Sequence, residues 1–182
     1  MENKNAEFLS DKRLPASTDA EQAILGGILL DPESISKTFG HLKKDSFYIM
    51  KHRQIFECML ELYNLSQPIE GLLLIEKMRE NGYYGGDEDK KYILTLAEAS
   101  SAISNIGYYI NIVEEKAKLR SIIDICGTAA DMCYDNSDFA ETIEYAEQKL
   151  FTLRNGISTD RMRRLDSVVR EEMDNLKELA SD

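Results

Sequence analysis

The chain has 182 residues, of which 43% are hydrophobic and 30% charged, with three prolines and a formal net charge of −11. This size and composition suit a mostly helical domain of ordinary size plus an extension. Surfaces that bind the phosphates of nucleic acids need clustered Lys and Arg, so the negative net charge argues against strong DNA binding and favours protein partners. The N-terminus has no apolar signal core, and no apolar run reaches the roughly 20 residues of a membrane span. We therefore expect a cytoplasmic protein that makes little direct contact with DNA and does not enter the membrane.

The first part of the chain predicts a loose tail over 1–13 and a compact helical head over 14–103. Thr18 and Glu21 have capping-box spacing, which predicts that both side chains cap the first helix. Gly26-Gly27 interrupts an apolar run where another helix could approach closely, and Gly82 is placed to end a helix in the left-handed conformation. The expected helices of the head cover 18–30, 32–40, 51–65, 71–81 and 89–100, with a turn at 45–48.

A long antiparallel helical hairpin is predicted over 104–155. Its first helix runs without proline to about Tyr134, and Asp138 with Glu141 repeats the capping-box spacing at the start of the second. Two helices joined by so short a turn form a hairpin, which cannot bury both of its faces alone. We therefore expect the hairpin to pack against another copy of itself.

A linker and a separate amphipathic helix are predicted over 156–182. Apolar residues recur there at a spacing of three and four, including Leu165, Val168, Val169 and Leu176. The helix follows a linker and has no obvious partner in this chain, so it either folds back or docks on another molecule.

The three cysteines, an odd number, indicate no disulfide framework. Cys126 and Cys133 lie seven residues apart on one expected helix, so they share a face about 10 Å apart, too far to bridge. We expect buried, reduced thiols.

Signatures of catalysis are missing from these 182 residues. The sequence has no phosphate-binding loop of the type G-x-x-x-x-G-K-[ST], and neither Gly26-Gly27 nor Gly85-Gly86 has the required lysine and spacing. His41 and His52 have no carboxylate three residues before them, and no Cys-x-x-Cys occurs. We therefore predict no catalytic, cofactor or metal residues. Five tyrosines near the end of the head favour core packing or a protein interface over base stacking: Tyr83, Tyr84, Tyr92, Tyr108 and Tyr109.

Several segments together resemble the N-terminal domain of the bacterial replicative DNA helicase, the DnaB-type family. The string Pro-x-Ser-x-x-Ala-Glu-Gln-x-Ile-Leu-Gly begins at Pro15 and is similar to the opening of that domain. The resemblance covers about 14–154, and 160–180 stands where the family has its linker helix. The other matching segments are Phe47-Tyr48 with His52, Ile55-Phe56 and Met59; Gln67 to Glu70; Tyr92 to Leu94; and Asn105-Ile106 with Tyr109, Ile112-Val113 and Glu115-Lys116.

The resemblance implies a non-catalytic collar of a helicase that unwinds duplex DNA at the replication fork. Such collars assemble from dimers into a hexameric ring, receive the primase C-terminal domain and influence helicase loading through a loader. The ATPase motor, which holds ATP and Mg²⁺ and moves 5′ to 3′, is absent from this chain, and the linker helix would dock on an adjacent motor domain. The residues assigned on this basis are Asp19 and Tyr92 for primase or head contacts; Ile110, Val113, Ile122 and Leu150 for hairpin pairing; and Leu165, Val168, Val169 and Leu176 for linker docking.

One departure from the family pattern is an acidic stretch, Asp87 to Lys91, after Gly85-Gly86, which predicts a turn of different shape. Two other functions stay open. The chain could be a free-standing regulator of the same fold, of phage or plasmid type, that binds helicase or primase. Less in keeping with its acidity, it could be an all-helical DNA-binding regulator. The apolar face of 165–180 favours a fragment of a longer helicase.

Overall fold

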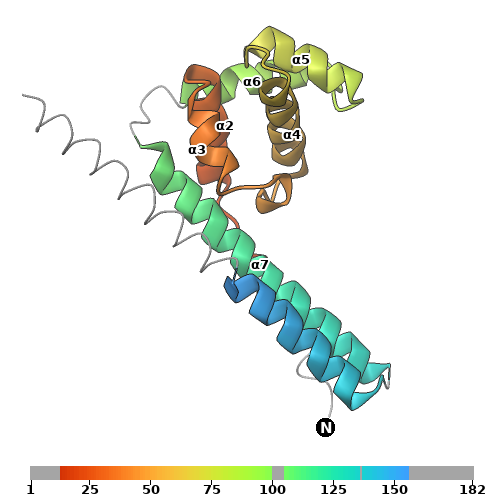
Figure 1. Ribbon diagram of the computed structural model, residues 1–182. Coiled ribbons are helices and arrows are strands. Elements are labelled where there is room, and N and C mark those ends of the chain that lie inside the picture. The colour runs from red at the N-terminus through yellow and green to blue at the C-terminus, as the bar shows by residue number, and fades with distance from the viewer. Residues whose placement is uncertain (1–12, 100–104, 136, 156–182) are drawn as a thin grey trace, which may run out of the picture. The chain divides into compact units, whose positions relative to one another are not determined.

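The computed structural model describes residues 13–99, 105–135 and 137–155, and every regular element in these ranges is helical (Figure 1). The chain divides into two compact units, Met1–Arg120 and Ser121–Asp182, which are considered separately. The elements are α2 (Thr18–Leu30), α3 (Ser34–Phe39), the short 3-10 helix η1 (Lys44–Ser46), α4 (Met50–Asn64), α5 (Gly71–Glu80), α6 (Asp87–Ala99) and α7 (Ile106–Tyr134), followed by a helix over 139–155.

The first unit has a single apolar core, built mainly between α2 and α6 and between α4 and α5. The rings of Phe47 and Phe56 lie in its centre with their centroids 4.8 Å apart. Burying one such side chain contributes roughly 1.5–3 kcal/mol, so this core holds the short helices together. Its fully buried members include Ile24, Leu25, Ile28, Ile35, Leu42, Ile55, Met59, Leu62, Leu74 and Met78.

Two of the glycines act as the sequence indicates. A Cβ atom on Gly27 would lie 3.2 Å from the Ile106 Cδ1 atom of α7, so this glycine allows α7 to approach α2 closely. Gly82 has a φ of 72° and follows the end of α5, where its N–H donates to the Arg79 carbonyl. A positive φ favours glycine because it has no Cβ, so the predicted helix stop at Gly82 is confirmed.

One local prediction for the head, the cap at Thr18 and Glu21, is wrong. The residue that precedes α2 is Ser17, which makes no side-chain capping bond, and the Glu21 carboxylate points away from the helix start to bind α4 and the segment before it. The acidic stretch from Asp87 to Lys91 forms the first turns of α6, which begins two residues before the expected start at 89, and the different shape of the preceding Gly85-Gly86 turn stays a prediction.

The first part of α7 belongs to the first unit, whose boundary lies at Arg120 within this helix, whereas the sequence placed the head–hairpin boundary at 103/104. Ile110 and Val113 are 3% and 1% exposed and are members of the apolar core.

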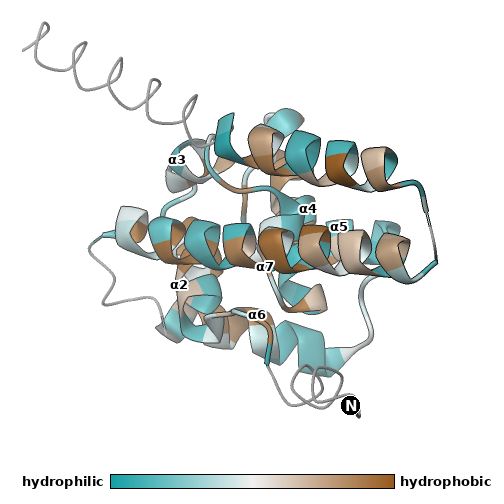
Figure 2. Cartoon of the chain, turned by 90° about the horizontal axis from the view of Figure 1, so that it is seen from below, coloured by the Kyte–Doolittle hydropathy of each residue, from teal (hydrophilic) through white to brown (hydrophobic). Residues whose placement is uncertain are grey.

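The second unit is a helical hairpin in its described part. The helix over 139–155 runs back beside the end of α7 (Figure 1). The Asp138 carboxylate accepts the Ala140 N–H at 2.8 Å, which confirms Asp138 as the cap of this helix. Hydrophobic residues occur along both helices (Figure 2), yet in this unit only Ile125 and Thr142 are buried among the residues described. No helix in the described ranges is long and apolar enough to cross a membrane.

Candidate protein-interaction sites

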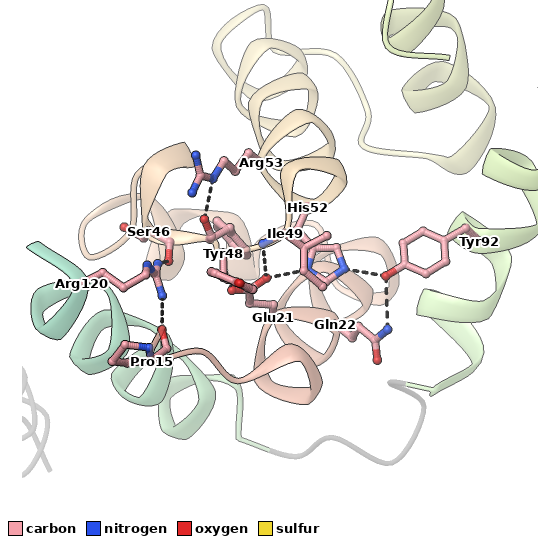
Figure 3. Close-up of polar contacts among 11 residues, drawn as sticks. Pro15, Glu21, Gln22, Ser46, Tyr48, Ile49, His52, Arg53, Tyr92 and Arg120 are labelled. Carbon is pink, nitrogen blue, oxygen red and sulfur yellow. Dashed lines mark hydrogen bonds and ion pairs between the residues drawn. The ribbon is translucent and has the colours of Figure 1, made fainter. Parts of the chain in front are cut away.

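A buried polar network joins α2 to α4 in the first unit (Figure 3). Glu21 and His52 are 1% and 0% exposed, and Glu21 Oε2 lies 2.6 Å from His52 Nδ1. The same carboxylate accepts the N–H groups of Tyr48 at 2.5 Å and of Ile49 at 3.3 Å. Because burial of an unpaired carboxylate is costly, these three donors explain how Glu21 is accommodated in the core.

Tyr92 extends this network to α6. Its hydroxyl lies 2.5 Å from His52 Nε2 and accepts a hydrogen bond from Gln22 Nε2 at 3.2 Å. The rings of His52 and Tyr92 stack with an interplanar angle of 11°, and Lys51 Nζ lies 5.5 Å from the centre of the Tyr92 ring. Tyr92, half-buried, thus has its hydroxyl in the network, while Asp19 is exposed in the first turn of α2. Their assignment to a partner interface stays a prediction.

Arg120, which the sequence analysis did not single out, binds the first part of α7 to the segment before α2 and to the end of η1. Its guanidinium donates to the Pro15 carbonyl at 2.7 Å and to the Ser46 carbonyl, and lies 5.8 Å from the Tyr48 ring (Figure 3). Partial burial lowers the pKa of Arg120, and the negative charge of Glu21 opposes that effect. Lys116 and Lys118 stand just before Arg120 in the sequence, so no pattern of residues set this arginine apart.

Asp89 is the buried member of the acidic stretch. Its carboxylate pairs with Lys51 and accepts the Gly85 N–H at 2.7 Å. The hydrogen bond from Lys51, followed by that from Gly85, holds the pKa of Asp89 below its ordinary value. The acidic residue therefore fixes the start of α6 against α4, and so also the position of Tyr92 one helical turn later.

The second unit carries an exposed apolar surface, which we call the hairpin stripe. Ile122 is 40% exposed and Leu150 is 42% exposed. In α7 the exposed residues Ile122, Cys126, Ala130 and Cys133 follow one another at a spacing of three or four, which places them on one face of the helix. The hairpin stripe comprises these four residues and Phe139, Ile143 and Leu150 of the 139–155 helix.

The residues predicted for hairpin pairing therefore fall into two groups. Ile122 and Leu150 belong to the hairpin stripe, whereas Ile110 and Val113 are buried in the core of the first unit and present no free surface. The residues predicted for linker docking, Leu165, Val168, Val169 and Leu176, lie outside the described residues.

The cysteines differ from one another in their surroundings. Cys58 is buried, as expected, and burial raises the pKa of its thiol to about 11. Cys126 and Cys133 are exposed, so the prediction that they are buried is wrong. A long helix can carry apolar residues on more than one side. In the second unit the covered side of α7 is the one that carries Ile125, and the side that carries the two cysteines is exposed. In the described ranges, no group of three or more His, Cys, Asp or Glu side chains is arranged to hold a metal ion.

The family model described as the DnaB-like helicase N-terminal domain matches residues 13–115. The replicative DNA helicase DnaC of Bacillus subtilis is 28% identical over 174 residues, which make up 95% of this chain and 38% of that protein. The replicative DNA helicase DnaB of Pasteurella multocida is 33% identical over 141 residues, 76% of this chain and 30% of that protein. The chain thus spans well under half the length of these relatives.

Solved structures agree with this assignment. The N-terminal domain of DnaB helicase from Mycobacterium tuberculosis matches with a TM-score of 0.70 at 27% identity, covering 77% of this chain and 99% of that one. The N-terminal domain of DnaB helicase from Helicobacter pylori matches in fold, with a TM-score of 0.56 at 22% identity, covering 64% and 90%. With a family match over more than half of its length and the same all-helical fold, the chain belongs to the family of DnaB-like helicase N-terminal domains.

Proposed function

We propose that this chain is a non-catalytic oligomerisation and partner-binding domain of a replicative DNA helicase, in which it forms part of a ring collar. The observation that carries the proposal is the hairpin stripe, a row of exposed apolar side chains in a domain of this family. A second copy of the chain is the occupant that we assign to the stripe, and pairs of hairpins would then build a dimer and further contacts a hexamer.

Pairing through the stripe depends on its apolar residues and works against like-charge repulsion, because seven Asp or Glu and no Lys or Arg occur between Ser121 and Gln148. Asp124 and Asp131 each precede a cysteine of the stripe by two residues, which corresponds to a turn of about 200° and places the acids on the opposite side of α7. The apolar face can therefore be covered by a second copy without burial of these carboxylates.

Contacts with other replication proteins are a second part of the proposal. The Helicobacter pylori domain was studied together with its interactions with primase. For this chain we assign the primase C-terminal domain to the face of α2 and α6 that carries Asp19 and Tyr92, because Asp19 is free at the surface and Tyr92 is held in place by the network. A helicase loader and, through 165–176, an adjacent motor domain complete the proposed partners. In the whole helicase, that motor would bind ATP and Mg²⁺.

The test of self-association is the mass in solution, measured by light scattering over a wide range of concentration. We expect the mass to rise from twice toward six times the 20.7 kDa of one chain. Ile122→Asp places a charge in the stripe and should hold the protein at one chain, with its helicity unchanged. Leu72→Asp, at an equally apolar but more exposed position of α5, is the matched control and should assemble normally. A wild-type protein that stays monomeric at every concentration would contradict the proposed pairing.

A free-standing regulator of the same fold is the second candidate, because the exposed apolar hairpin stripe could equally bind a separate replication protein. Such a regulator would bind a separate helicase or primase and change its activity. Addition of the purified chain to a full-length helicase distinguishes the two functions. A regulator would alter DNA unwinding at stoichiometric amounts, and a collar domain would not.

A further inference from the structure

We propose that Cys126 and Cys133 form a modification site at which a small disulfide, such as oxidised glutathione, attaches a thiol group and thereby releases the self-association of the hairpin. The inference rests on the proposed function, since it concerns the surface through which two copies would pair. It assigns to that surface a chemical means of control.

The position of the two thiols supports this proposal. Both cysteines are exposed, and both lie in the hairpin stripe, flanked by Ile122 on the same face of α7. Their spacing of seven residues returns them to nearly the same angle around the helix. Pairing through the stripe would cover both thiols, so the free chain would react and the paired chain would be protected.

The third cysteine provides a contrast within the same chain. Cys58 is fully buried in the core of the first unit, and its thiol has a pKa raised to about 11 by burial. Because the thiolate is the reacting form and needs access to the disulfide, Cys58 is unreactive in the folded protein. A modification reagent therefore acts on the second unit alone.

The reaction is an exchange that needs no separate oxidant. The cysteine loses its proton, and its thiolate attacks one sulfur of the small disulfide. A new S–S bond forms between protein and glutathione, the original S–S bond breaks, and the second glutathione leaves as a thiolate that takes up a proton. Cys126 and Cys133 cannot then resolve this adduct with each other, because they are about 10 Å apart along one helix and a disulfide requires Cα atoms within about 7 Å.

The adduct changes the physical character of the stripe. Glutathione is a tripeptide with two carboxylates and one ammonium group, and it would stand where Ile122 and its neighbours present apolar surface. Burial of those charges without partners is unfavourable, and the added volume prevents close packing of two hairpins. We expect the dissociation constant to rise by at least about 30-fold, as for loss of a central interface side chain.

The test uses the full chain, reduced and then treated with oxidised glutathione. Intact-protein mass spectrometry counts the adducts, and light scattering gives the assembly state before and after treatment. We expect two adducts, loss of the assembled species and its return after reduction with dithiothreitol. The variant Cys126→Ser/Cys133→Ser should keep its mass in oxidised glutathione, and the treatment should leave its own assembly state unchanged, while Cys58→Ser should respond like the wild type.

The outcomes separate this inference from the proposed function. Assembly that persists with both adducts present, or an absence of adducts even at concentrations where the chain is monomeric, would overturn the modification site and leave the pairing intact. A covalent dimer on a non-reducing gel would also overturn it, because the thiols would then link the copies. If the reduced wild-type chain never assembles, the pairing itself is wrong and the inference is lost with it.

Discussion

Glu21 joins α2 to α4 and to the segment before α4, and its removal should be among the most damaging single changes in the chain. Glu21→Ala removes the acceptor for the N–H groups of Tyr48 and Ile49 and the partner of His52 Nδ1. Each buried donor left without an acceptor costs about 1–3 kcal/mol, and Glu21→Ala leaves three such donors. We therefore expect a loss of about 4 kcal/mol.

A loss of this size is a large part of the 5–15 kcal/mol that stabilises an ordinary domain. Glu21→Gln keeps the shape and one acceptor oxygen, so the Tyr48 N–H can keep its bond. The amide nitrogen then replaces the oxygen that faces Ile49 and His52. We expect about 1–2 kcal/mol for this variant, which separates the loss of an acceptor from the loss of packing.

The free energy of unfolding would be measured by urea titration with far-ultraviolet circular dichroism. Glu76→Ala, at an exposed position of α5, is the matched control and should change stability by less than about 0.5 kcal/mol. A loss below about 1 kcal/mol for Glu21→Ala, or equal losses for the Ala and Gln variants, would refute the argument that the buried network carries this stability.

Two further changes test other parts of the first unit. Asp89→Asn weakens the pairing with Lys51. In the folded protein the pKa of Asp89 lies below its ordinary value of 3.8. The stability that this carboxylate contributes is therefore present above pH 3.8 and is lost as the pH falls through the folded-state pKa. Thermal melts should therefore show wild type and variant differing at pH 7 and converging as the pH falls below 3.8, and a difference that is independent of pH would contradict this. Gly27→Leu adds a side chain where a Cβ alone would already lie 3.2 Å from Ile106, so we expect a loss of about 1–3 kcal/mol in a urea titration, whereas unchanged stability would mean that α7 does not pack there.

Apolar residues that recur at helical spacing over long segments were sufficient to predict the helices themselves. The apolar spacing in 51–65 predicted α4, which covers Met50–Asn64, and the absence of proline after Ser104 predicted α7. Glycine positions were also informative, because a positive φ at Gly82 or a close contact at Gly27 depends on the missing Cβ. These features depend on local chemistry that can be inferred from neighbouring residues.

The errors concern side chains whose partners are distant in sequence. Glu21 had a local capping role available three residues away, but its partner His52 lies 31 residues further on, and a buried charge–hydrogen-bond network outweighs a solvent-exposed cap. The exposure of Cys126 and Cys133 was missed for a related reason. Periodicity shows that a helix has apolar stripes, but the stripe that contacts a neighbouring helix depends on the fold.

The contacts that complete the first unit join residues far apart in the chain, so the order of synthesis affects when this unit can fold. α2 is made early, but its main neighbour α6 ends at Ala99, and Arg120 binds the Pro15 carbonyl across 105 residues. At about 5–20 residues per second, ribosomes need on the order of 5–20 s to pass from one end of this contact to the other. During that interval the part of α2 that packs against α6 stays uncovered until α6 has been made. The nascent head is therefore a substrate for chaperones until the middle of α7 has emerged, long after its own first helix has been made.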